Sequence, residues 1–444
     1  MNRYLTGTAV LLTAVLLSAR PAMSQPVRQL TLQEAIALAL EKNPTFQIAK
    51  ADVEKSESQI REAYGLAMPT IEGSLQYTRN LKKPVFFLPD FNNPNSGKVT
   101  PIEIGSNNSY TASLSLTQAL FSKTVGTALE VAEVYQDYTT EGVSASRSQT
   151  ILDVKKAYYG LLLARRMQTV IGKVYQLTEA NYQNVKAMYE QGLASEFDQL
   201  RMSVQLANMK PSVVQAENGV RLAELNLKNT IGIQETPVPA DDFDFAVLPD
   251  DQIQRGEDAA IQLNPTIRQL QFQKTLLEKN KEIKEAGYWP SLYGFGTWQT
   301  QTQSEDFKFG SYTWVESAYI GLNLSIPIFS GFQTTAQVEQ ADLEVRKMDL
   351  TISQVQKTIT LGVRNAALKM SEARERVEAQ QAAIGQAEKA LSIAEIRFKS
   401  GVGMQLEVLD AQVALSQTLT NHAQAVYDYL VARADWEQLV GTGK

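Results

Sequence analysis

The sequence predicts an α+β membrane protein with an internal two-fold repeat, in which each chain supplies four barrel strands and two very long helical hairpins. Three observations predict it. Residues 124–191 and 332–400 contain no proline, short segments ahead of them alternate apolar and polar residues, and the same landmarks recur in both halves of the chain. Because a helix rises about 1.5 Å per residue, each proline-free stretch can reach roughly 100 Å.

The first residues predict a secretory signal peptide at 1–24. Arg3 supplies a positive charge, Ala9–Leu17 form a short apolar core, and small residues precede a cleavage site before Gln25. An uncleaved N-terminal anchor over 8–19 is the alternative interpretation. We therefore expect an exported chain. Since the chain contains no cysteine, it can carry neither a disulfide nor a thioether-linked lipid.

Charge and hydropathy exclude several classes of protein. The chain has 42 basic and 48 acidic residues, whereas a nucleic-acid surface would need clustered Lys and Arg, so no nucleic-acid partner is expected. Beyond the signal peptide, no apolar run has the length of about 18 residues that a transmembrane helix requires. A membrane crossing would therefore need a closed β-barrel, the other fold that pairs every main-chain group in lipid.

An internal duplication organises the chain into two structural repeats, which we expect at 25–240 and 241–444. Each repeat has the order helix, strand, loop, strand, very long helix, tight turn and returning helix. The offset between matching landmarks is 221 residues at first and 208 or 209 after a loop of different length. The matching pairs are Asn43-Pro44 with Asn264-Pro265, Pro69 with Pro290, Phe121-Ser122 with Phe329-Ser330, Gly192 with Gly401, and Ile231-Gly232 with Val440-Gly441.

The helices have recognisable ends. The opening helix is expected from Leu32 to about Tyr64, with Thr31 as N-cap and Glu34 completing a capping box. Returning helices are expected after Gly192 and Gly401, the glycines that end the two proline-free stretches. Apolar residues at heptad-like spacing, many of them Ala, favour close coiled-coil packing along these stretches.

Four segments are expected to be strands of a sheet between lipid and water, and all but one of them alternate cleanly between an apolar and a polar face. They are residues 70–78, 110–117, 291–299 and 319–326. Along 291–299 the apolar residues fall on both faces, so the sequence does not assign them. Tyr77, Tyr110, Trp298, Trp314 and Tyr319 are candidates for interfacial aromatic belts. The alternative is the edge of a soluble β-sandwich or a small α+β domain.

Four strands cannot close a barrel. Membrane barrels have at least eight strands, and eight leave an interior filled by side chains. Three chains would give twelve strands and space for water, with the two repeats alternating around a pseudo-six-fold ring. The sequence therefore predicts a trimeric twelve-stranded barrel continued by a long α-helical barrel.

Several segments resemble the TolC-like outer-membrane factor family over nearly all of the mature chain. They are Leu-Thr-Leu-Gln-Glu-Ala at 30–35 with Asn43-Pro44, Pro-Ile-Phe-Ser-Gly at 327–331, and Gly401 followed by Leu-Glu-Val-Leu-Asp-Ala at 406–411. The order, duplication and spacing of these segments make the resemblance specific.

The resemblance implies a homotrimer in the cell outer membrane, surrounded by outer-membrane lipid, with a helical extension across the periplasm. It also implies two partners, a periplasmic membrane-fusion adaptor and an inner-membrane transporter. The implied function is the passive exit duct of a tripartite efflux or type I secretion system.

The resemblance further implies a periplasmic gate formed by acidic residues just after the hairpin turns. The matching residues here are Asp198, Glu407 and Asp410. Rings of carboxylates in a narrow mouth favour cations. The alternative interpretation is a helix cap, because Ser195 and Asp198 fit a Ser-x-x-Asp pattern.

One departure from the family concerns the latch of the closed entrance. Family members with a well-described latch have Tyr and Arg where this chain has Phe398 and Gly403, so the same contacts cannot form. Arg397 or Lys399 are candidates to replace them, and a solvated face is the alternative for both.

Adaptor contact is expected at the hairpin tips, where glycine permits close approach of another backbone. A plain left-handed turn is the alternative reading of these glycines. The expected contact residues are Gly192, Leu193, Ala194, Ser195, Gly401, Val402, Gly403 and Met404.

No enzymatic site is expected, and no catalytic residue, cofactor or bound metal is predicted. The only histidine, His422, has no metal-spacing neighbours, and the chain contains neither a phosphate-binding glycine loop nor a nucleophile elbow. Residues 81–109, with Phe86 and Phe87, are expected to form an extracellular loop that could contact phage or colicin. Two other functions remain as alternatives, a soluble periplasmic coiled-coil scaffold without a pore and an exported hydrolase.

Overall fold

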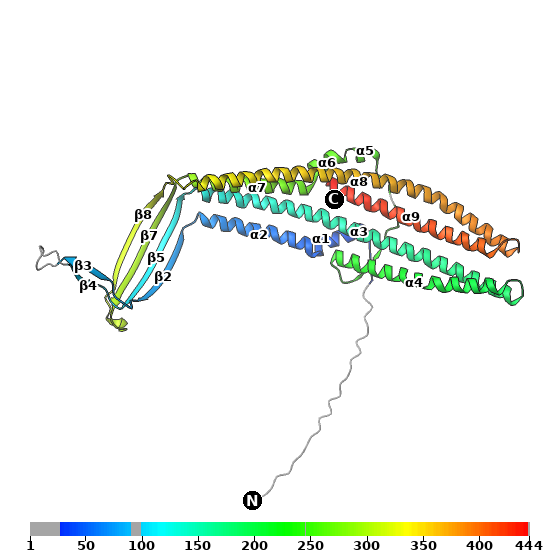
Figure 1. Cartoon of the computed structure of the whole chain (residues 1–444), viewed down its shortest axis with the longest axis horizontal. Helices are drawn as coiled ribbons and strands as arrows, with labels where there is room; N and C mark the ends of the chain where they lie inside the picture. The colour runs from blue at the N-terminus through cyan, green and yellow to red at the C-terminus, as the bar shows by residue number, and fades with distance from the viewer. Residues whose placement is uncertain (1–26, 90–98, 245, 443–444) are drawn as a thin grey trace, which may run out of the picture.

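The computed structural model describes residues 27–89, 99–244 and 246–442. The predicted signal peptide at 1–24 lies outside the described residues. The molecule is elongated, with a β-sheet at one end and two helical hairpin tips at the other (Figure 1). None of the helices in the described ranges combines the length and apolar character needed to cross a bilayer.

Two long hairpins form most of the length, as predicted. The first pairs α3 (Lys123–Glu190) with α4 (Glu196–Ile231), and the second pairs α8 (Gln333–Lys399) with α9 (Gln405–Val440). Near the sheet, α2 (Pro44–Leu66) packs on α3, and α7 (Pro265–Glu285) packs between α3 and α8. The short helices α1 (Leu32–Lys42), α5 (Asp250–Gln254) and α6 (Gly256–Leu263) lie near the middle of the molecule (Figure 1).

The opening helix differs from the prediction. The capping box of Thr31 and Glu34 is present, but the expected helix over Leu32–Tyr64 is broken at Asn43, which ends α1 and caps α2. Pro44 cannot donate a main-chain hydrogen bond and disfavours helical geometry in the residue before it, so a continuous helix was the wrong prediction.

The duplicated landmarks meet at this break. Asn43 Nδ2 donates to Thr230 O at 2.7 Å, and Asn264 Nδ2 donates to Leu439 O at 2.8 Å. Gly232 and Gly441 follow those carbonyls with positive φ, and a Cβ on either glycine would lie 2.7 Å from a main-chain oxygen of the facing helix. In each repeat, the Asn-Pro break therefore packs against the glycine that ends the returning helix, and the two form one junction.

The main sheet contains the four predicted strands. They are β2 (Thr70–Arg79), β5 (Asn108–Phe121), β7 (Ser291–Ser304) and β8 (Val315–Ser325), antiparallel in the order β2-β5-β7-β8. Registered pairs share a face, so the faces of all four strands can now be assigned.

The register places the strand near 291–299, which the sequence left unassigned. Trp298 pairs with Leu114 and Ala318, and Leu292 pairs with Leu324, so both lie on the apolar face. Phe295 lies on the polar face, where a Cβ on Gly321 would be only 2.6 Å from its ring. The apparent irregularity is thus an aromatic ring covering a glycine of the neighbouring strand.

Two small sheets were not predicted. β3 (Val85–Pro89) and β4 (Val99–Glu103) form an antiparallel ribbon inside the segment expected to be a loop, and β1 (Val27–Leu30) pairs in parallel with β6 (Thr236–Pro239). All four strands are too short to show clear alternation, and three of them contain proline or end at it.

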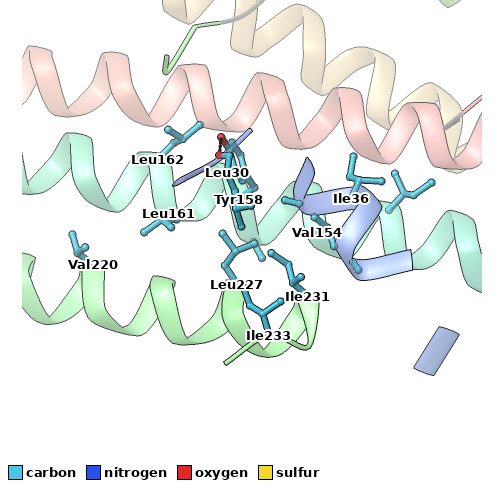
Figure 2. Packing of buried hydrophobic residues seen from close by; sticks show 14 residues of the cluster. Leu30, Ile36, Val154, Tyr158, Leu161, Leu162, Val220, Leu227, Ile231 and Ile233 are labelled. Atoms are coloured by element: carbon cyan, nitrogen blue, oxygen red, sulfur yellow. Dashed lines mark hydrogen bonds between the residues drawn. The ribbon is translucent and has the colours of Figure 1, made fainter. Parts of the chain in front are cut away.

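The largest apolar core lies near the middle of the molecule, where α1, α3, α4 and β1 meet (Figure 2). Leu161, Leu227 and Ile231 are fully buried there. The Tyr158 hydroxyl lies 3.0 Å from Leu30 O and 2.8 Å from Asp241 Oδ2. Burial raises the pKa of Tyr158, so the hydroxyl stays neutral and ties β1 to the segment after β6.

Ion pairs join the two hairpins at the same level. Lys155 Nζ on α3 lies 2.6 Å from Glu437 Oε2 on α9, and Arg433 Nε lies 2.8 Å from the other Glu437 oxygen. Burial acts to raise the pKa of Glu437, but the hydrogen bonds and charges of Lys155 and Arg433 outweigh it and hold that pKa below its usual value. Both Lys155 and Glu437 are mostly buried.

We predict that Glu437→Leu destabilises the protein by about 3 kcal/mol, because it leaves the buried Lys155 amine without its partner. The double variant Lys155→Met/Glu437→Leu should recover part of this loss. In the wild type, the Glu437 carboxylate stabilises the folded state because its folded pKa is lower than its unfolded pKa. This stabilisation is present above the unfolded pKa near 4.3 and is lost as the pH falls through the folded pKa. The apparent midpoint of thermal unfolding, measured from pH 3 to 7, checks both statements. An equal loss in the single and double variants would contradict them.

Candidate functional site

The first hairpin tip is a tight turn closed by main-chain hydrogen bonds. Gly192 has φ +72°, its N–H donates to Tyr189 O at 2.9 Å, and Leu193 N–H donates to Met188 O at 2.7 Å. Ser195 then caps α4. The left-handed turn, the alternative reading of Gly192, is present, and the Leu193 side chain is exposed.

The second tip uses the same turn with one further constraint. Gly401 also has φ +72°, and the N–H groups of Val402 and Gly403 both donate to Arg397 O. A Cβ on Gly403 would lie 2.9 Å from the Arg397 Cβ and 3.1 Å from its carbonyl carbon. Gly403 is therefore needed for close packing of the turn on α8, while Val402 and Met404 remain exposed.

The three predicted gate carboxylates lie in different surroundings. Asp198 belongs to the helix cap, with its Oδ2 2.5 Å from Ser195 Oγ and its N–H donating back to that hydroxyl. Glu407 forms an ion pair with Arg397 at 3.4 Å. Asp410 is exposed and forms no ion pair within the described part of the chain. Within the described residues, the side-chain hydrogen bonds and ion pairs of Asp198 and Glu407 stay inside their own hairpins, so a ring of these acids would need several copies of the chain.

The residues considered for a latch also lie in different surroundings. Arg397 is half-exposed and is engaged by Glu407 of its own hairpin. Phe398 and Lys399 line a cavity of about 470 Å³ between the two tips, together with Met188 and Leu193 of the first hairpin. The apolar part of this cavity is open to solvent and lies beside the turns predicted to contact an adaptor.

Sequence reasoning missed one contact between the hairpins. Gln405 Nε2 on α9 donates to Met202 Sδ on α4 at 3.3 Å, and both residues are buried. The available signal was the heptad position of Gln405, which shares its helix face with Val408 and Gln412.

The sheet ends in two strands that each have a neighbour on one side only. β2 and β8 are the edges of the sheet, and their apolar side chains are exposed, with Leu75 88% and Ile320 91% accessible. Long, flat, apolar edges of this kind are sites of pairing with another chain.

The helical layer has matching apolar edges. On α8, exposed apolar residues recur at spacings of 7 or 11, which return to the same face of a helix. They are Leu343, Leu350, Leu361 and Leu368. Exposed residues on α2 and α4 form the opposite edge, and they are Ile48, Leu66, Leu200, Val214, Leu222 and Leu225.

Nothing in the described ranges resembles a metal centre, because no three His, Asp or Glu side chains come together there. His422 is half-buried, and burial together with the Arg166 charge lowers its pKa. A neutral, half-buried histidine is consistent with a structural role.

Comparisons with known proteins agree on one family. A family model described as outer membrane efflux protein matches residues 35–233 and 258–442. The chain is 22% identical to the outer membrane protein TolC of Vibrio cholerae over 336 residues, covering 74% of this chain and 76% of that protein. It is 22% identical to the alkaline protease secretion protein AprF of Pseudomonas aeruginosa over 410 residues, covering 91% and 83%.

Solved structures support the same fold. The CmeC outer membrane channel of Campylobacter jejuni aligns with a TM-score of 0.73 at 18% identity, covering 93% of this chain and 86% of that one. The outer membrane protein VceC of Vibrio cholerae aligns with a TM-score of 0.71 at 16% identity, covering 92% and 96%. A four-stranded sheet continued by long helical hairpins is thus a known arrangement.

Proposed function

The chain belongs to the outer membrane efflux protein family, and from this premise we propose that three copies close into one duct through which solutes leave the cell unchanged. Its location is the outer membrane, and its role is that of an exit duct rather than of a soluble scaffold. The observation that carries the proposal is the pair of unpaired sheet edges, β2 and β8.

Closure of the sheet requires other copies. Each chain supplies four strands, and unpaired main-chain groups are too costly to leave in lipid. Two copies would give eight strands and an interior filled by side chains, whereas three give twelve strands and an aqueous lumen. In this arrangement β2 of one copy pairs with β8 of the next.

The helices of neighbouring copies also pack edge to edge. The apolar stripe of Leu343, Leu350, Leu361 and Leu368 on α8 packs against the stripe on α2 and α4 of the neighbouring copy. Along the sheet, the apolar face of Leu75, Leu114 and Ile320 contacts lipid, and the face of Thr and Ser side chains lines the lumen.

Aromatic residues support a membrane boundary at the outer end of the sheet. Tyr77 and Tyr110 stack with ring centroids 5.0 Å apart, and Tyr110 also contacts Phe309 and Tyr312. Such clusters are characteristic of interfacial belts. Trp298 and Trp314 belong to the same proposed belts. Tyr319 pairs with Thr297 and packs against Phe295 on the polar face, so its assignment to a belt was wrong.

The tips face the periplasmic partners in this proposal. The exposed Leu193, Val402 and Met404, with the cavity beside Phe398, offer apolar contacts to a membrane-fusion adaptor coupled to an inner-membrane transporter. Export through the predicted signal peptide at 1–24 precedes assembly, and the repeats at 25–240 and 241–444 alternate around the ring.

Purified protein in planar bilayers tests the duct. We predict discrete conductance steps from a species containing three chains. Leu361→Glu should prevent assembly, because it introduces a charge into the stripe on α8, whereas Thr169→Glu on the central helix α3 should assemble normally. Native mass spectrometry measures the number of chains. Conducting monomers, or normal trimers of Leu361→Glu, would argue against the proposal.

The acidic gate has its own test. Glu407 is paired with Arg397 and Asp198 with Ser195, whereas Asp410 is exposed and makes no ion pair with any residue that the structure describes. Asp410→Asn should therefore reduce cation selectivity most among the single variants. The combined variant Asp198→Asn/Glu407→Gln/Asp410→Asn should reduce it further. Reversal potentials in a salt gradient measure the effect. Unchanged reversal potentials in the combined variant would remove these residues from the gate.

A further inference from the structure

We propose that the polar face of the sheet binds neutral saccharides, so that the wall of the lumen favours carbohydrate among the solutes that pass through it. The inference rests on the proposed duct function and names the class of solute that its wall recognises. It depends on three features of this face, which are its near absence of charge, its open amide and hydroxyl groups, and a pair of aromatic rings.

The polar face carries almost no charge. The register of the strands aligns it in rungs made mainly of Ser, Thr and Gln, and one such rung consists of Ser74, Ser113, Gln299 and Ser317. Among the residues of the four described strands, Glu72 is the only charged one on this face. A highly charged solute would need many opposite charges in the wall, so this face suits a neutral polar solute.

The amides on this face are open to a solute. The side chains of Gln76, Gln299 and Gln301 make no hydrogen bond with any residue that the structure describes, and none of them is buried. Amide groups donate and accept hydrogen bonds, as do the hydroxyls of the Ser and Thr residues beside them. The hydroxyl groups of a sugar need partners of both kinds, and this wall offers them along its length.

Two aromatic rings lie on the same face. A Cβ on Gly321 would be 2.6 Å from Phe295 Cζ and 3.0 Å from its Cε1, so the Phe295 ring lies across β8 rather than projecting away from the sheet. The Tyr319 ring is 6.3 Å from it between centroids, at an interplanar angle of 73°. The two rings therefore form a corner, and Tyr319 is 53% exposed.

This corner suits the apolar side of a sugar. The C–H groups of a pyranose ring form a flat apolar face, which packs against aromatic carbon through dispersion, while the hydroxyls at its rim reach polar groups. A charged peptide or a metal ion has no such combination of faces. The rings of Phe295 and Tyr319 thus distinguish a saccharide from other polar solutes.

The single carboxylate lies on the rung of Tyr319. This rung runs from Glu72 through Ser115 and Thr297 to Tyr319. Glu72 is exposed and forms no ion pair within the described ranges. An ionised carboxylate accepts hydrogen bonds on both oxygens, so it can bind two neighbouring hydroxyls of one sugar. Three copies would place three such sets of groups around the lumen.

Planar-bilayer recordings of the wild-type protein test the inference with maltoheptaose as the probe and polyethylene glycol of the same hydrodynamic size as the reference. Maltoheptaose should lower the single-channel conductance at concentrations where the reference polymer has no effect. In Phe295→Leu/Tyr319→Leu, the half-effective concentration should rise about tenfold, because leucine still covers Gly321 but offers no ring. Leu322→Ala, on the lipid-facing side of β8, is the matched control and should leave that concentration unchanged.

Tyr319→Leu alone keeps the test decisive if the double variant assembles poorly. Tyr319 is exposed and covers no glycine among the described residues, so its loss should not disturb the sheet. The half-effective concentration of maltoheptaose should rise about threefold, as expected for the loss of one of two ring contacts.

The outcomes separate the two proposals. Equal effects of maltoheptaose and the reference polymer on a conducting wild-type trimer, or an unchanged half-effective concentration in the assembled leucine variants, would overturn saccharide binding and leave the duct intact. A larger effect of hexalysine than of maltoheptaose would also overturn it, since the wall would then select cations through Glu72. Absence of conductance from the wild-type trimer would instead overturn the duct.

Discussion

The main-chain hydrogen-bonding groups on the outer sides of β2 and β8 have no strand partner within the described part of the chain, and the rest of the architecture depends on satisfying them. A sheet of four strands can neither close on itself nor expose its edges to lipid. The exposed apolar stripes on α8, α2 and α4 likewise need a neighbouring chain to cover them. The sheet edges and the helical edges therefore both require neighbouring copies of the chain, and closing the ring of copies encloses the lumen.

The duplication explains how one chain supplies two similar parts of such a wall. In each repeat, an asparagine ends one helix, begins the next and bonds to a carbonyl at the end of the returning helix. Gly232 and Gly441 then make room for the backbone they meet. These residues recur because each repeat contains the same junction. The Lys155–Glu437 ion pair joins the two repeats beside it.

Much of this fold could be predicted because the signals were local. Absence of proline indicated the long helices, and alternation indicated the four main strands. Other features depend on contacts that a linear sequence does not display. The faces of β7 became clear only when Phe295 was seen to cover Gly321, and the break at Asn43 required Pro44 to be weighed above an apolar stripe. The β3–β4 ribbon and the β1–β6 pair were missed because such short segments form strands only when a partner strand pairs with them.

At the tips, the glycine turns are present, but the pairing of Glu407 with Arg397 and the burial of Gln405 depend on packing between helices. The roles of the predicted gate and adaptor residues remain predictions.

The Lys155–Glu437 ion pair joins the two hairpins of one chain, but a duct depends on contacts between chains. The number and pairing of the chains is therefore the central claim. A single-particle reconstruction of the extracted protein in lipid nanodiscs tests it most directly. We predict three chains, with β2 of each hydrogen-bonded to β8 of its neighbour around an open lumen. A single chain in which β2 and β8 pair with each other, or a ring of any other number, would contradict it.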